Sequence, residues 1–157
     1  MRIVLAFIAL FLGTYTNSAF ARWAYVQKDV QGDRLTYAEK TGKAGGVLRV
    51  VCTGKEFHFQ MAMPQNVKAN QTSLAIRVDT NRERMIAGSI LRNAAGISIF
   101  VGKDWRGEPA VGMKQIIRDM KEGSRVMVSD SVTGALIDSF PLKGLRPALG
   151  KAYRKCS

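Results

Sequence analysis

Residues 47–62 read VLRVVCTGKEFHFQMA, and their pattern indicates a β-rich fold. Half of the first part, residues 47–52, is valine, a β-branched residue that favours a strand. The last part, residues 56–62, alternates apolar and polar side chains with the two-residue period of a half-buried strand. The intervening TGK at 53–55 is a short turn sequence. The stretch therefore predicts an antiparallel hairpin. The side chains on its core face are Phe57, Phe59 and Met61.

His58 is the only histidine and falls on the other face of this hairpin. A serine-histidine-aspartate triad needs one histidine, so a catalytic role is formally open. The chain has no G-x-S-x-G motif, however, and a polar residue between two core-facing phenylalanines is typical of the opposite side of a strand. We therefore expect a surface or edge histidine rather than a catalytic one.

Further runs on both sides of the hairpin predict more short strands, because they alternate or are rich in β-branched residues. The connections between these runs are short, which favours antiparallel pairing. The weakest run is interrupted by Gly88. The runs cover residues 34–40, 73–79, 84–91, 96–101, 125–129 and 135–140.

Apolar residues spaced i, i+3, i+4, i+7 begin at Met113 and again at Leu145, and this spacing predicts two amphipathic helices. Gly123 is placed to end the first helix as a C′ glycine. Pro147 is tolerated in the first turn of the second helix, whose apolar stripe reaches Cys156. The patterns together predict a mostly β (α+β) fold. We expect an antiparallel β-sandwich or open barrel of about seven to eight strands, with one mid-chain helix and one C-terminal helix.

The first 21 residues have the order of a secretory signal peptide. Arg2 precedes an unbroken apolar run over residues 3–12, and small residues lead to a cleavage site after Ala21. This run is too short to span a bilayer, which takes about 20 apolar residues. A buried core helix is the alternative. We expect residues 1–21 to be removed and residues 22–157 to form a single β-rich globular domain, periplasmic or secreted, with no later membrane-spanning segment.

Cys52 and Cys156 are the only cysteines, and an exported protein meets an oxidising compartment. We expect an intramolecular disulfide that staples the C-terminal segment to the middle of the domain. Two buried free thiols or a redox pair are the alternatives, although the chain has no C-x-x-C. Two cysteines and one histidine are too few for most metal sites built from Cys and His alone. No phosphate-binding glycine motif occurs either. We therefore expect no cofactor.

The chain has 24 Lys and Arg against 12 Asp and Glu, a net charge of +12. Cleavage after Ala21 removes Arg2 and no acid, which lowers this charge to +11. Such a surface attracts anionic lipid, lipopolysaccharide, cell-wall polymer, nucleic acid or acidic proteins. Nucleic acid is the weaker partner, because aromatic residues are few and an exported protein meets little of it. The candidate cations are Lys143, Arg146, Lys151, Arg154, Lys155, Arg77, Arg82 and Arg84. A merely cationic surface without a partner is the alternative.

The remaining chemistry-bearing side chains favour structural roles. Asp79 and Glu83 flank a turn interleaved with arginines, which predicts ion pairs rather than a general acid with a raised pKa. Asp138 is too isolated to assign. We expect Trp23 and Trp105 to fill the core at the ends of a sheet rather than to bind a ligand.

The run SFPLKGLRPAL at residues 139–149, closed by Cys156, resembles a set of exported proteobacterial proteins with a strand reading F-x-L-x-G, a helix with A-L and a terminal cysteine. VLRVVCTG at 47–54 and AIRVD at 75–79 add to the likeness. The order resembles VasI-type accessory proteins of type VI secretion and is similar to the C-terminal part of invasion-associated locus B proteins. The resemblance covers most of the mature chain and supplies no catalytic residues. It implies an exported, disulfide-stapled accessory protein that works by binding.

The sequence therefore predicts a non-enzymatic exported accessory or binding protein that uses a basic surface. The resemblance links it to secretion or host interaction, and so to virulence. The expected partner is an anionic envelope component or an acidic protein. An inhibitor or immunity-type binder of another exported protein is the alternative, followed by a hydrolase without a recognisable motif. The sequence predicts no oligomeric state.

Overall fold

The computed structural model describes residues 22–30, 33–67, 73–103 and 109–156. Within this part of the chain no helix is long and apolar enough to cross a membrane. The expected signal peptide at residues 1–21 and Trp105 lie outside the described residues.

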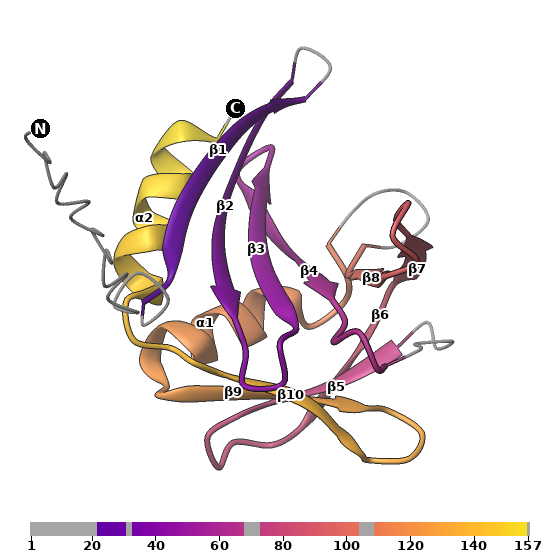
Figure 1. The fold of residues 1–157 in the computed structure, drawn as a ribbon. Helices are drawn as coiled ribbons and strands as arrows, with labels where there is room; N and C mark the ends of the chain where they lie inside the picture. The colour runs from indigo at the N-terminus through magenta and orange to yellow at the C-terminus, as the bar shows by residue number, and fades with distance from the viewer. Residues whose placement is uncertain (1–21, 31–32, 68–72, 104–108, 157) are drawn as a thin grey trace, which may run out of the picture.

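The described residues form two antiparallel sheets and two helices (Figure 1). The six-stranded sheet has the order β1-β2-β3-β4-β8-β7 and the four-stranded sheet the order β10-β9-β5-β6. The strands of the first sheet are β1 (Ala24–Val30), β2 (Asp33–Thr41), β3 (Val47–Thr53), β4 (Glu56–Ala62), β8 (Ser98–Val101) and β7 (Ser89–Arg92). Those of the second are β10 (Leu136–Pro141), β9 (Arg125–Asp130), β5 (Ser73–Val78) and β6 (Arg84–Ala87). The helices are α1 (Met113–Glu122) and α2 (Leu145–Lys155). The predicted mostly β, sandwich-like α+β fold is confirmed.

The hairpin of β3 and β4 forms as expected, with Val50 opposite Phe59. Gly54 and Lys55 connect the strands with φ values of 55° and 65°. Two consecutive residues with positive φ form the type I′ turn, whose twist matches that of the flanking strands. Phe59 and Met61 are buried in the core, and Phe57 packs half-buried at its border.

The described ranges contain ten strands rather than about seven to eight, for two reasons. Strand β1 was not predicted, and the run at 84–91 divides into two strands that belong to different sheets. The division falls at Gly88, where an added Cβ would lie 2.3 Å from the carbonyl oxygen of Val101. Gly88 is therefore the point at which the chain crosses between the sheets, and the crossing leaves no room for a side chain.

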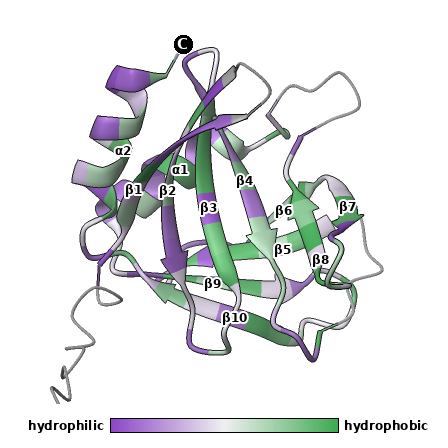
Figure 2. Cartoon of the chain, turned by 45° about the horizontal axis from the view of Figure 1, so that its top comes forward, coloured by the Kyte–Doolittle hydropathy of each residue, from purple (hydrophilic) through white to green (hydrophobic). Residues whose placement is uncertain are grey.

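The two sheets and both helices share one hydrophobic core. Helix α2 lies against β1, β2 and β3, and α1 lies against β4 and β5. Figure 2 shows hydrophilic and hydrophobic bands alternating along α2, as the amphipathic pattern predicts. The buried helical side chains are Met113, Ile116, Ile117 and Met120 in α1, and Leu145, Ala148, Leu149 and Ala152 in α2.

Gly123 ends α1 as expected, but not for the expected reason. Its φ is −86°, outside the left-handed region that a C′ glycine usually occupies. An added Cβ at Gly123 would instead lie 2.4 Å from Cγ1 of Val78 on β5. The glycine is required because the end of the helix closely approaches the four-stranded sheet.

Trp23 is a core residue, as predicted. Its side chain is 5% exposed, and its indole Nε1 donates a hydrogen bond of 2.8 Å to the carbonyl oxygen of Pro141 at the end of β10. The bond satisfies the polar edge of a buried indole and joins the first strand to the last.

Candidate anion-binding groove

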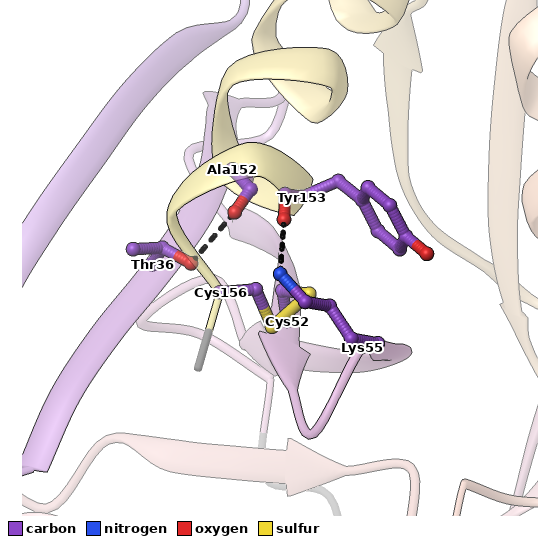
Figure 3. The surroundings of a disulfide bond; sticks show 6 residues. All are labelled: Thr36, Cys52, Lys55, Ala152, Tyr153 and Cys156. Atoms are coloured by element: carbon purple, nitrogen blue, oxygen red, sulfur yellow. Dashed lines mark hydrogen bonds between the residues drawn. A yellow bond between two sulfur atoms is a disulfide. The ribbon is translucent and has the colours of Figure 1, made fainter.

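The predicted disulfide forms between Cys52 on β3 and Cys156 after α2, which are 104 residues apart in sequence. Two hydrogen bonds accompany it (Figure 3). Thr36 Oγ1 donates to the carbonyl oxygen of Ala152 at 3.0 Å, and Lys55 Nζ donates to that of Tyr153 at 3.2 Å. The last turn of α2 is thereby fixed to the six-stranded sheet and to the β3–β4 turn.

A groove runs between α1 and α2, and the start of β4 closes its third side. Its α2 end has a cavity volume of about 510 Å³, and its part along α1 a volume of about 320 Å³. The two parts share Phe57, Arg118 and Lys121, so they adjoin each other. The other described lining residues are Lys55, Glu56, Lys114, Ile117, Glu122, Arg146, Leu149, Gly150 and Tyr153.

The floor of the groove is apolar and aromatic. The rings of Phe57 and Tyr153 lie 6.1 Å apart, centre to centre, at an interplanar angle of 40°. Lysine ammonium groups lie over both rings: Lys121 Nζ is 5.7 Å from the centre of Phe57, and Lys55 Nζ is 5.2 Å from that of Tyr153. The aromatic faces therefore help to place positive charge along the groove.

Cations outnumber carboxylates in this groove. Lys114, Arg118 and Lys121 stand at i, i+4 and i+7 on α1, so they share one helical face. Arg146 reaches across from α2 and donates from Nε and Nη2 to the carbonyl oxygen of Lys121, at 3.2 and 3.0 Å. This contact bridges the two helices and satisfies a carbonyl in the last turn of α1.

The groove also contains two carboxylates, Glu56 and Glu122. Glu56 Oε1 lies 3.1 Å from Lys114 Nζ. The pair is largely exposed, so it contributes little to stability and leaves both groups accessible to a ligand. The groove thus has mixed charges with a net positive sign.

The structure does not bring the eight predicted cations together on one surface. Arg146 lines the groove, whereas Lys143 and Lys151 line a second hollow of about 320 Å³ beside Trp23. Arg154 and Lys155 are exposed at the end of α2. The helix does present its cations outward, as predicted, but in several directions.

The mid-chain arginines lie elsewhere. Arg77 is on the outer face of the four-stranded sheet, with Nη2 3.9 Å from Sδ of Met127. Arg82 is exposed in the turn after β5. Arg84 Nε lies 3.7 Å from a carboxylate oxygen of Asp119 on α1. These three positions have no part in the groove.

Sequence reasoning missed four groove cations, Lys55, Lys114, Arg118 and Lys121. Three of them are spaced one helical turn apart in a helix that was predicted, so the signal was present in the sequence. The C-terminal cations were predicted instead because they are more closely spaced in the sequence.

His58 is buried, so the expectation of a surface or edge histidine is wrong. The register places it in one row with Val51 and Tyr37, and all three are at most 3% exposed. Both faces of the sheet are thus covered here, and alternation does not indicate which face meets water. Burial lowers the pKa of His58 to about 4, and the positive charge of Lys103 acts in the same direction. Its Nδ1 has no hydrogen-bond partner among the described residues.

Two aspartates bind main-chain groups. Asp79 accepts from the backbone N–H groups of Ser124 and Arg125, at 2.8 and 2.9 Å, rather than pairing with the neighbouring arginine side chains as expected. Asp138 is buried and accepts from three backbone N–H groups. Its donors are Ala44, Gly46 and Ser139. Asp138 therefore ties the β2–β3 turn to β10.

Within the described ranges, no three His, Cys, Asp or Glu side chains are grouped as a metal site would require. Comparisons with protein-family models, with curated proteins and with solved structures find no match to the chain. The resemblance to VasI-type and invasion-associated locus B proteins therefore stays a prediction.

Proposed function

We propose that this chain is an exported, non-enzymatic accessory protein that binds an anionic ligand in the groove between α1 and α2. The observation that carries the proposal is the row of Lys114, Arg118 and Lys121 above an aromatic floor, with Arg146 in the part of the groove at α2 and Lys55 in the part along α1. The ligand class is an anionic envelope component or an acidic protein.

The groove combines two sources of affinity. Its cations attract and orient a negative ligand, and this part of the binding weakens as salt screens the charges. Its floor offers Phe57 and Tyr153 to apolar groups of the ligand. An amphipathic anion satisfies both parts, so we expect binding that salt weakens without abolishing.

The side chains of the groove favour binding over bond cleavage. Its described lining consists of cations, aromatic and aliphatic groups and two carboxylates, and Lys114 already engages Glu56. An exposed carboxylate paired with a lysine suits a structural or recognition role. The buried His58 is not among the lining residues.

The groove is tested by titrating the purified mature chain with fluorescent poly-L-glutamate and with phosphatidylglycerol vesicles, at about 50 and 300 mM NaCl. Replacing both Arg118 and Lys121 by Ala is expected to weaken binding of at least one probe by about tenfold. Replacing both Lys143 and Lys151 by Ala is the matched control, because it removes the same charge from the second hollow. Equal losses in the two variants, or no binding by the wild type, would contradict the proposal.

Export is tested separately, by fractionating cells that express the full chain and measuring the intact mass of the product. We expect a chain that begins at Arg22 in the envelope or the medium. A full-length chain in the cytoplasm would overturn the export part of the proposal and make nucleic acid the leading partner.

A further inference from the structure

No contact within this chain explains why residue 150 is a glycine. It lies in the interior of α2, where glycine is among the least favourable residues. A Cβ added there would have only one atom within 4 Å, Nη1 of Arg154 at 3.8 Å, which is ordinary contact. Its φ is not positive either. Gly88 and Gly123, by contrast, have no room for a side chain.

Gly150 lies on the wall of the groove. The same part of the groove is lined by Arg146, Leu149 and Tyr153. Because Gly150 has no side chain, the helix backbone is bare between Arg146 and Tyr153. A glycine in such a position permits another backbone or a bulky group to approach closely. No described part of this chain fills the space, so it is open to a group of a ligand.

The mixed charge of the groove indicates what kind of ligand this is. A uniform polyanion lying along α1 would meet the carboxylates of Glu56 and Glu122 as well as the cations. A polypeptide can place acids opposite the cations and apolar or basic side chains opposite the remaining surface. The aromatic floor formed by Phe57 and Tyr153 also suits an apolar side chain between acids.

We propose that the occupant of the groove is an acidic segment of a partner protein, and that its main chain passes over Gly150. This inference rests on the proposed function and narrows it to a polypeptide ligand. The cations of α1 hold the acidic side chains, and the gap at Gly150 sets the distance between the segment and α2.

The test begins with a phage-displayed library of random peptides of about 12 residues, selected on the mature chain. We expect the enriched peptides to combine acidic and apolar residues, and the synthetic peptides to bind the wild type in solution. Replacing Gly150 by Ala is expected to weaken this binding about tenfold, and Gly150→Leu to weaken it further. The same Gly150→Ala change is expected to raise Tm by a few degrees, because alanine favours the helix. Lost binding in a more stable protein cannot be attributed to unfolding.

Lys151→Ala is the control, because it alters the next residue of α2 outside the groove. Enriched peptides without acids, or equal affinities for wild type and both Gly150 variants, would overturn the inference. Tighter binding of heparin, or of phosphatidylglycerol vesicles, than of any acidic peptide would identify a polymer or lipid occupant instead. In those cases the proposed function survives if the Arg118 and Lys121 replacements still weaken binding of an anionic probe. Absence of binding to every probe would end both proposals.

Discussion

Lys55 donates a hydrogen bond of 3.2 Å to the main-chain carbonyl of Tyr153, and its ammonium lies 5.2 Å from the centre of the same residue's ring. The two residues belong to different elements, the β3–β4 turn and the last turn of α2. The Cys52–Cys156 bond joins these elements beside this contact (Figure 3). One end of the groove is therefore assembled from segments that the disulfide holds together.

Replacing Cys52 and Cys156 together by Ser is expected to destabilise the fold by up to about 4–5 kcal/mol, the chain-entropy value for a loop of this length. The urea midpoint of the purified variant measures this loss. Affinity for poly-L-glutamate is also expected to fall, because Tyr153 is no longer fixed beside Lys55. Thr36→Val is the control, since it removes one hydrogen bond to Ala152 and keeps the covalent link. An unchanged midpoint in the double variant would contradict the role of the bond.

The elements that the sequence predicted are those with a clear periodicity. Both helices bury one face, so their apolar residues recur at three and four residues. Strand β4 alternates apolar and polar residues in sequence, which indicates the hairpin although both faces of the sheet are covered near His58. Strand β1 escaped prediction because it is an edge strand whose polar residues fall on both sides, as AYVQKDV shows. The crossing between the sheets at Gly88 was not predicted, because one glycine inside a strand pattern does not indicate a change of sheet.

The groove was harder to predict than the fold. Its cations come from the β3–β4 turn, from α1 and from α2, which are distant in sequence. Lys55 and Arg146 line different parts of the groove, and Lys55 reaches α2 only because the sheet and the disulfide place the hairpin beside that helix. Density of charge along the chain is a poor guide to density on the surface, since Lys143 and Arg146 are three residues apart and line different hollows.

Burial of His58 predicts a dependence of stability on pH. Its pKa is lowered to about 4 in the folded chain from 6.5, so between these values the unfolded chain binds a proton that the folded chain does not. Stability therefore falls as the pH drops through this window, by roughly 3 kcal/mol from this residue. Urea titrations of wild type and His58→Gln at pH 6.5 and pH 4 isolate the contribution.

The His58 effect has a direct spectroscopic check, because the chain has one histidine. NMR signals of a single imidazole report its titration without overlap. A native-state midpoint near the ordinary value, or parallel pH profiles for wild type and His58→Gln, would contradict the prediction.

Asp138 and Asp130 both accept hydrogen bonds from main-chain groups of turns, and they are expected to differ in their effect on stability. Asp138→Asn places an amide where a carboxylate accepts from buried N–H groups, and is expected to destabilise the fold by about 2–3 kcal/mol. Asp130 accepts from Val132 and Thr133 in an exposed turn, where water can replace the carboxylate. Asp130→Asn is therefore expected to change the free energy of unfolding by less than about 1 kcal/mol. Similar losses for the two variants, measured by urea denaturation, would mean that burial does not decide the effect.

Gly88→Ala tests the crossing between the sheets. The added methyl would lie 2.3 Å from the carbonyl oxygen of Val101 and 2.6 Å from Cζ of Phe100, so the chain must shift. Overpacking of this kind is expected to cost about 1–3 kcal/mol. Gly150→Ala is the matched control, because it adds the same methyl at ordinary contact distance from Arg154 and is expected to stabilise the fold by up to about 1 kcal/mol. The measurement is thermal unfolding of both variants. If Gly88→Ala unfolds at the same temperature as the wild type, the crossing has room for a side chain. Another constraint must then explain why β6 and β7 separate at this residue.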